Sequence, residues 1–264
     1  MSLNLEPVRD IFHAMTKQQL HGIPFSEIIG GGDPMAIALE VATTFISHAR
    51  PTRRDSILDV GCGCGRIAAA LTQYLDQDGS YVGVDIVPAL VKFAQRWITS
   101  RYPHFRFLTL DQGNRSYDWL RENSRVDINT LAAAGPAASF DLALAVSLFT
   151  HLDLAPAIEM LTAIRPLLKA GGRAFVTVFV LNDDSRQSIE QKKSDLNFKH
   201  RTPSGELYSE KPKEIDPTFA VGYDDLHLQE LMSSSGFRLE QHIPGYWSTH
   251  GGKGIYQDAL ILRK

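Results

Sequence analysis

The sequence predicts an α/β protein with a doubly wound sheet. Short apolar segments alternate with amphipathic helical segments over most of the 264 residues, which is typical of parallel strands joined by helical crossovers. A glycine-rich turn follows the first strand, and the last two strand segments have no helix between them, so that they pair antiparallel. We therefore expect a Rossmann-like, seven-stranded sheet, mostly parallel, with one antiparallel C-terminal edge strand and helices on both faces.

Each strand is predicted from a short and largely apolar run of residues. The seven runs are 56–60, 81–86, 105–110, 140–147, 171–180, 237–243 and 257–264. The run 140–147 is almost entirely apolar, which is typical of a strand that is buried on both of its faces.

Capping residues predict where several helices begin. Asp33 is a suitable N-cap, Pro34 occupies the first helical position, and Pro51 ends the helix that they begin. Asp153 caps another helix in the same way. The remaining helical patterns cover 66–75, 88–102 and 223–236. The N-terminal region (1–50), which contains the helix that begins at Pro34, is expected to form a helical cap.

Two long segments do not fit the alternation of strands and helices. The segment 111–139 is partly helical, and 182–222 is polar, charged and interrupted by prolines. Segments of this length usually form lids or binding elements, or are disordered. We expect one domain (1–264) in which both segments are insertions that roof a ligand site.

The composition excludes several classes of protein. The net charge is −3, with 44% hydrophobic and 22% charged residues, so the chain has no basic bias of the kind that marks nucleic-acid binding. The first residues lack the basic and apolar regions of a signal peptide, and no uncharged apolar run is long enough to span a membrane. We expect a cytoplasmic, soluble protein without membrane or nucleic-acid partners, and the sequence leaves its oligomeric state open.

The glycine-rich turn reads ILDVGCGCGR over residues 57–66. A turn at this place in a doubly wound sheet lies where nucleotide-like ligands bind. A dinucleotide fingerprint would need a third glycine where Arg66 stands, and no phosphate-binding P-loop is present. The carboxylate of Asp59 would repel a pyrophosphate, so it favours a ligand with an amine or a sulfonium.

The segment LDVGCGCGR resembles motif I, [DE]-x-G-x-G-x-G, of the class I S-adenosylmethionine-dependent methyltransferases. The resemblance continues, in the same order as in that family, through four further segments. These are VGVDI with Asp85, FLTLDQGN with Asp111, FDLALAVSLFTHL, and LLKAGGRAFVTVF, in which Ala170 stands where proline is usual. The chain is identified as a member of this family from about residue 36 to 264, apart from the two insertions.

The resemblance implies an enzyme that uses S-adenosylmethionine as methyl donor and releases S-adenosylhomocysteine. In the family, the turn surrounds the methionine and ribose parts of the cofactor, the acid after the second strand binds both ribose hydroxyls, and the acid after the third strand lies near the adenine. The implied cofactor-binding residues are Asp59, Gly61, Cys62, Gly63, Gly65, Asp85, Ile86, Asp111, Gln112 and Ser147.

The acceptor implied by the resemblance is a small molecule that is methylated on oxygen or nitrogen. The segments NRSYDW, GYDDLHLQELMSSSGF and GYWSTHGGKGIYQDALILRK resemble a bacterial subgroup that acts on sugars or small metabolites, so a sugar or a secondary metabolite is the expected acceptor. The aromatic residues Phe25, Tyr117, Trp119 and Trp247 either line its pocket or pack in the core.

His151 is the candidate catalytic residue, because it follows the fourth strand at the ligand edge and a histidine can accept a proton from a hydroxyl group. The alternative for His151 is a purely structural role in the turn before a capped helix. Asp85 and Asp111 have the same alternative, because aspartate is common in turns. No metal site is expected, because Cys62 and Cys64 are two thiols and zinc needs three or four ligands.

Two other functions remain open from the sequence. An NAD-dependent oxidoreductase would explain Asp85, but neither Arg66 nor the reversed strand pair. A non-catalytic protein that binds S-adenosylmethionine on the same fold is the second alternative.

Overall fold

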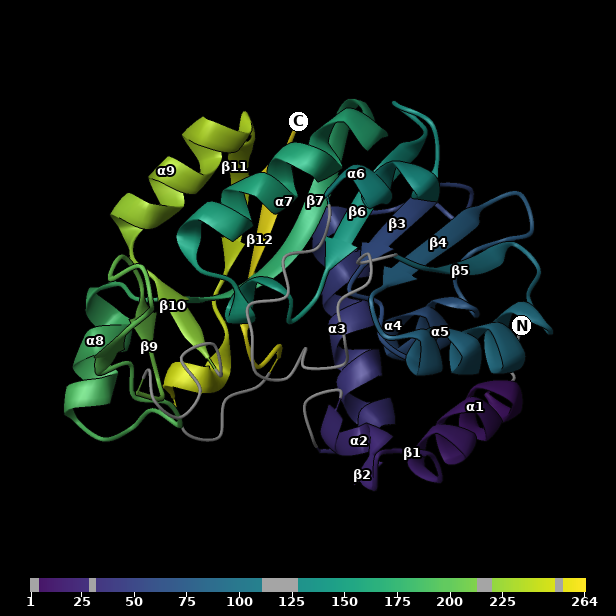
Figure 1. The fold of residues 1–264 in the computed structure, drawn as a ribbon, viewed down its shortest axis with the longest axis horizontal. Helices are drawn as coiled ribbons and strands as arrows, with labels where there is room; N and C mark the ends of the chain where they lie inside the picture. Colours follow the sequence, from purple (N-terminus) through teal and green to yellow (C-terminus); the bar gives the residue numbers. More distant parts are fainter. Residues whose placement is uncertain (1–4, 29–31, 111–127, 213–219, 250–253) are drawn as a thin grey trace.

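A computed structural model describes residues 5–28, 32–110, 128–212, 220–249 and 254–264 (Figure 1). Its central sheet has the order β5-β4-β3-β6-β7-β12-β11. The strands are β3 (Ser56–Val60), β4 (Ser80–Asp85), β5 (Phe105–Thr109), β6 (Phe140–Ala145), β7 (Leu168–Val180), β11 (Arg238–Ile243) and β12 (Asp258–Arg263). The five strands from β5 to β7 are parallel, and the predicted mostly parallel, doubly wound sheet is confirmed.

The reversed strand does not lie at the outermost position that the sequence predicted. β12 runs antiparallel to both of its neighbours, β7 and β11, and β11 forms the edge. Burial explains this order, because five of the six residues of β12 are buried, whereas the first four residues of β11 are exposed. The more apolar strand therefore takes the inner place.

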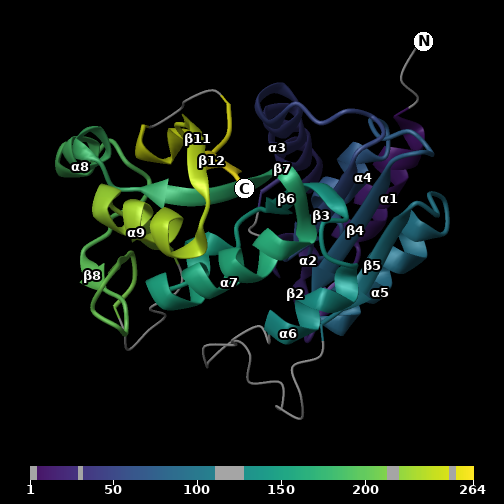
Figure 2. The same ribbon diagram turned by 90° about the horizontal axis from the view of Figure 1, so that it is seen from above.

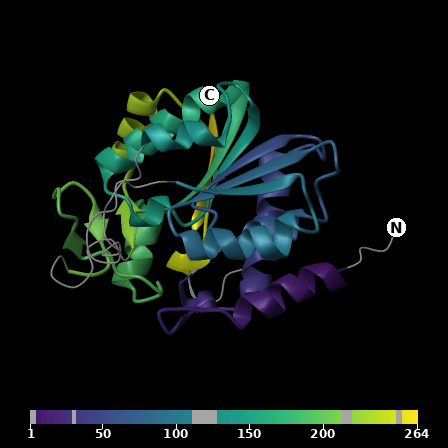
Figure 3. The ribbon, with the colours of Figure 1, turned by 45° about the vertical axis from the view of Figure 1, so that its right-hand side comes forward.

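Helices cover both faces of the sheet, as Figure 3 shows. One face carries α3 (Pro34–Ala49), α4 (Arg66–Leu71) and α5 (Pro88–Ala94), and the other carries α6 (Ile128–Leu131), α7 (Leu154–Leu167) and α9 (Asp225–Ser235). The predicted cap of α3 is confirmed, because the Asp33 carboxylate accepts hydrogen bonds from the backbone of Met35 and Ala36.

The N-terminal segments add a further layer outside α3 and α4. They are α1 (Glu6–Thr16), β1 (Gln19–Leu20), β2 (Ile23–Pro24) and α2 (Phe25–Ile28). The helix α1 contacts α3 and α4 and buries Ile11 and Met15 in the same core cluster. Phe25 is buried as well, with its ring centroid 5.7 Å from that of Phe93, so it packs in the core.

The segment 182–222 contains regular structure in its described part. It forms α8 (Asp183–Glu190), β8 (His200–Arg201), β9 (Tyr208–Ser209) and β10 (Val221–Tyr223). β10 pairs in parallel with the last residues of β7, and Figure 2 shows α8 and β8 beyond that end of the strand. The Asp153 carboxylate, which caps α7, also accepts hydrogen bonds from Thr202 and Ser204 and fixes this segment to the sheet edge.

The other long segment is helical where it is described. Residues 111–127, including Asp111, Gln112, Tyr117 and Trp119, lie outside the described residues. The following α6 contacts α7, and the short helix η3 (Ala132–Ala134) follows it; Leu131 and Ala134 are buried in the core. This part belongs to the helical layer rather than to an insertion above the sheet.

A buried carboxylate joins the end of the chain to β7. Asp258 accepts hydrogen bonds from the backbone of Val180 and Gly245 at 2.9 Å and from the Trp247 indole at 2.6 Å. His242 Nε2 lies 3.1 Å from Oδ1 of Asp258, the oxygen that also accepts the Gly245 hydrogen bond. The Trp247 ring packs against Phe179 and is buried, so it belongs to the core.

We predict that Asp258→Ala lowers the free energy of unfolding by about 3 kcal/mol or more, because several buried donors lose their acceptor together. Urea unfolding measures the effect. The control is Glu240→Ala, which removes an exposed pair with Arg263 and costs less than about 1 kcal/mol. Equal losses in the two variants would contradict this role of Asp258.

Candidate functional site

The glycine turn between β3 and α4 requires glycine for steric reasons. Gly61, Gly63 and Gly65 have φ angles of 79°, 55° and 82°, in the left-handed region that side chains disfavour. A Cβ atom on Gly65 would lie 2.6 Å from the side chain of Ile98. The Gly61 and Cys62 amides both donate to the Val84 carbonyl, so the turn is fixed to β4.

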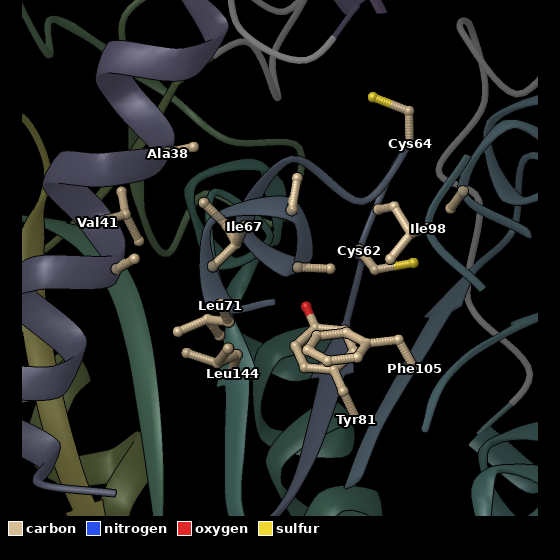
Figure 4. Close-up of a cluster of buried hydrophobic side chains, with 14 of the residues drawn as sticks. Ala38, Val41, Cys62, Cys64, Ile67, Leu71, Tyr81, Ile98, Phe105 and Leu144 are labelled. Atoms are coloured by element: carbon tan, nitrogen blue, oxygen red, sulfur yellow. The ribbon is translucent and has the colours of Figure 1, made fainter. Parts of the chain in front are cut away.

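The two cysteines of the turn pack in the core. Cys62 and Cys64 are 6% and 0% exposed, and Figure 4 shows them among buried side chains that include Ile98 and Tyr81. Burial raises the pKa of both thiols, that of Cys64 to about 12, so both remain neutral. The described residues contain no group of three or more histidine, cysteine or acidic side chains arranged to bind a metal ion.

Asp59 lies beneath the turn and not in the cleft. The alternation of β3 places it on the same face as Ile57, where it is 2% exposed and accepts a hydrogen bond from the Tyr81 hydroxyl. Burial, with a smaller contribution from the charge of Asp85, raises the pKa of Asp59 to about 7, although the Tyr81 hydrogen bond opposes the shift. The carboxyl group of Asp59 thus faces the core, and its expected contact with the cofactor stays a prediction.

Asp85 ends β4 directly beside the turn. Its Oδ2 accepts a hydrogen bond from the Gly63 amide at 2.8 Å, and its Oδ1 accepts one from the Val87 amide at 2.9 Å. Burial raises its pKa, and these backbone hydrogen bonds oppose that shift. Each oxygen keeps acceptor capacity for one further donor, so the carboxylate both shapes the turn and can accept two hydroxyl groups.

The end of β6 contributes the other predicted residues. Ser147 has a φ of 58°, and its amide donates to Thr177 Oγ1 at 2.7 Å. His151 is exposed and ends the short helix η4 (Phe149–His151), which contacts β7 and β10. Ile86 follows Asp85 and is partly buried between the two main core clusters.

The parallel strands bring these groups to one edge of the sheet. β3, β4 and β6 end there, so the glycine turn, Asp85 and Ser147 lie at their carboxyl ends, where ligands bind in this kind of sheet. Sequence reasoning missed Thr177 and Gln257, which also reach this edge. The only signal for Thr177 was a hydroxyl residue within the apolar run AFVTVFV.

Comparison with known proteins gives the decisive observation. Residues 58–174 match the family model described as a methyltransferase domain, and this range includes the glycine turn, Asp85 and the end of β6. These residues form a methyltransferase domain of the class I S-adenosylmethionine-dependent type. S-adenosylmethionine is accordingly the methyl donor of this methyltransferase and S-adenosylhomocysteine its product, and an NAD-dependent oxidoreductase is set aside.

Solved structures share the fold of this methyltransferase at low sequence identity. A methyltransferase from Methanosarcina mazei is 19% identical, with a TM-score of 0.54, over 83% of this chain and 96% of that one. The 1,6-didemethyltoxoflavin N1-methyltransferase of Burkholderia thailandensis is 18% identical, with a TM-score of 0.52, over 87% and 79%. Mitomycin 7-O-methyltransferase is 14% identical, with a TM-score of 0.57, over 96% and 60%.

The described residues of the methyltransferase fit the cofactor. The Asp85 carboxylate has the two acceptor oxygens that a ribose diol requires. Gly61, Gly63 and Gly65 add no side chains to the turn next to it. Among the described residues, no helix is long and apolar enough to cross a membrane.

We predict that the methyltransferase loses stability as the pH rises from about 4 to about 7. In this window the folded state keeps the proton on Asp59 that the unfolded chain releases, because the folded pKa lies above the unfolded one. The loss due to Asp59 is about 4 kcal/mol at most. Asp59→Asn flattens the profile measured by urea unfolding at several pH values.

The control is Asp76→Asn, which changes an exposed carboxylate paired with Arg53 and leaves the slope in place. An unchanged slope in Asp59→Asn would show that Asp59 is not a buried acid in the folded protein. Part of the slope persists in this variant, because burial raises the pKa of Asp85 in the same direction.

We also predict that Asp85→Ala weakens S-adenosylhomocysteine binding by roughly 1.5–3 kcal/mol, through the loss of charge-assisted hydrogen bonds. Isothermal titration calorimetry measures the affinity. Asp85→Asn serves as a second variant, because its amide oxygen can still accept one backbone hydrogen bond and so disturbs the turn less. Wild-type affinity in both folded variants would rule out a role for Asp85 in binding the ribose.

Proposed function

We propose that this methyltransferase transfers a methyl group to oxygen or nitrogen of a small-molecule acceptor, of the sugar or secondary-metabolite type. The observation that carries the proposal is a group of polar side chains at the carboxyl-end edge of the sheet. They are Ser147 and Gln257, which are partly exposed, and His151, which is exposed. Two structures of similar fold support it, because their names assign a mitomycin oxygen and a toxoflavin-precursor nitrogen as acceptors.

The protein contributes mainly alignment to this reaction. When bound, the cofactor supplies a methyl group that its sulfonium already activates. The turn and Asp85 then have to hold the donor in one position while the acceptor approaches in line. Orientation of this kind supplies on the order of 7–11 kcal/mol of the reduction in barrier.

His151 acts in this proposal as the general base for a hydroxyl acceptor. It lies on η4, directly after β6, and an imidazole nitrogen can accept the proton of the hydroxyl group while the acceptor oxygen attacks. An amine acceptor that is already neutral would not need this step.

The acceptor pocket is bordered, in the same proposal, by the described parts of the N-terminal region (1–50) and of the segments 111–139 and 182–222. Support comes from Asp153, which ties the second segment to the start of α7 at the ligand edge. The pairing of β10 with the end of β7 holds that segment above the same edge.

Transfer of a radioactive methyl group from S-adenosylmethionine tests the proposal. The acceptor panel contains monosaccharides, phenols, catechols, aromatic amines and N-heterocycles. We expect a methylated product from at least one class, and His151→Ala should lower kcat for a hydroxyl acceptor by about 10²–10⁴-fold with unchanged S-adenosylhomocysteine affinity.

His104→Ala is the matched control, because His104 directly precedes β5 at the amino ends of the parallel strands, away from the proposed site, and its loss should leave kcat unchanged. Normal turnover in His151→Ala would remove His151 from the chemistry. Cofactor binding without transfer to any acceptor would favour the alternative of a non-catalytic binding protein.

A further inference from the structure

The side-chain amide of Gln257 is oriented by two hydroxyl groups from neighbouring strand ends. Thr177 Oγ1 lies 2.6 Å from Gln257 Oε1, and Ser147 Oγ lies 3.1 Å from the same oxygen. Thr177 is buried at 0% exposure, whereas Gln257 is partly exposed directly before β12. Three segments that are distant in the sequence therefore meet at one amide group.

The direction of these hydrogen bonds determines which amide atom faces the hydroxyls. Thr177 Oγ1 accepts the hydrogen bond of the Ser147 amide, and a buried hydroxyl also uses its own hydrogen. It therefore donates to Gln257, so the atom facing it is the amide oxygen. The Nε2 group of Gln257 points away from both hydroxyls and has no hydrogen-bond partner among the described residues.

The backbone of Ser147 is held in an unusual conformation at the same place. Its φ of 58° is rarely adopted by residues with side chains, and such conformations cluster at functional sites, where surrounding contacts impose them. Here the contact is the hydrogen bond to Thr177. The strained turn after β6 thus serves to present both the Ser147 amide and its hydroxyl to the Thr177–Gln257 pair.

The amide lies on the face of the sheet that α3 covers, at the end where ligands bind. Phe45 of α3 packs on Phe175 of β7, with ring centroids 5.6 Å apart, and Thr177 is two residues nearer the carboxyl end on the same face. Ser147 also follows β6 at this end. Gln257 therefore lies at the carboxyl ends of β6 and β7, at the edge of the sheet that also carries the glycine turn.

We propose that Gln257 Nε2 donates a hydrogen bond to the methyl acceptor, and so selects acceptors with a carbonyl oxygen or ring nitrogen near the methylated atom. The inference rests on the proposed function and names the recognition element of that site. Ser147 and Thr177 are positioning residues, because they act on the acceptor only through Gln257.

Nuclear magnetic resonance of the side-chain amide tests the proposal on the protein saturated with S-adenosylhomocysteine. The Nε2 signals of Gln257 are assigned by their loss in Gln257→Leu. The probe is N-methyl-2-pyridone, which has a carbonyl oxygen, and toluene is the matched ring without one. We expect these signals to shift with N-methyl-2-pyridone and not with toluene, and Thr177→Val to reduce the shift.

The affinity for the same probe gives a second readout. Gln257→Leu should raise the Kd of N-methyl-2-pyridone about two- to tenfold, as expected for one hydrogen bond, with unchanged S-adenosylhomocysteine affinity. Gln241→Leu is the control, because the Gln241 amide is exposed on β11 and contacts His48 instead. Its Kd for the probe should equal that of the wild type.

Unmoved Gln257 signals up to the solubility limit of N-methyl-2-pyridone would overturn the proposal, as would wild-type affinity in Gln257→Leu. Equal responses to toluene would overturn it too, because binding would then not depend on the carbonyl oxygen. The readouts do not use turnover, so an absence of methyl transfer by the wild type would count against the proposed function alone.

Discussion

The site depends on one hydrogen bond, from the Gly63 amide to the Asp85 carboxylate. It joins the turn after β3 to the end of β4, next to the point between β3 and β6 at which the strand order reverses. The turn can reach that carboxylate because three of its glycines adopt positive φ angles. The same close approach lets α4 pack on Ile98 without a side chain between them. Cofactor binding and the start of α4 therefore depend on the same backbone.

The two acids around this turn cost stability. Asp59 is buried and Asp85 is partly buried, and burial raises the pKa of each carboxyl group. A core with a neutral side chain in place of Asp59 would avoid this cost. Asp59 instead accepts a hydrogen bond from the Tyr81 hydroxyl beneath the turn. Natural proteins commonly accept such local costs at functional sites.

Most of the sheet was predictable because its strands are short apolar runs with glycine and proline between them. The turn was predictable as well, since the spacing of Gly61, Gly63 and Gly65 is a local pattern. The inner position of β12 was not, because it depends on how burial is shared between two strands that pair with each other. The segment 111–139 was expected to be partly helical, but the bounds of its helices at 128–134 were not predictable, since the pattern there is short.

The contacts on the acceptor side could not be predicted from local patterns at all. Thr177 and Gln257 are 80 residues apart, and Ser147 and Gln257 are 110 apart, so only the pairing of β12 with β7 brings them together. Single polar residues within apolar runs carry no signal of which partner they will meet. The proposed cofactor half of the site therefore depends on one local turn, and the proposed acceptor half depends on the topology of the sheet.

We propose that the glycine turn and Asp85 form a site for S-adenosylmethionine and not for a dinucleotide. Calorimetric titration of the purified protein with S-adenosylhomocysteine and, separately, with NADH distinguishes the two ligands. We expect saturable binding of S-adenosylhomocysteine at one site and no binding of NADH. Binding of NADH without binding of S-adenosylhomocysteine would contradict it.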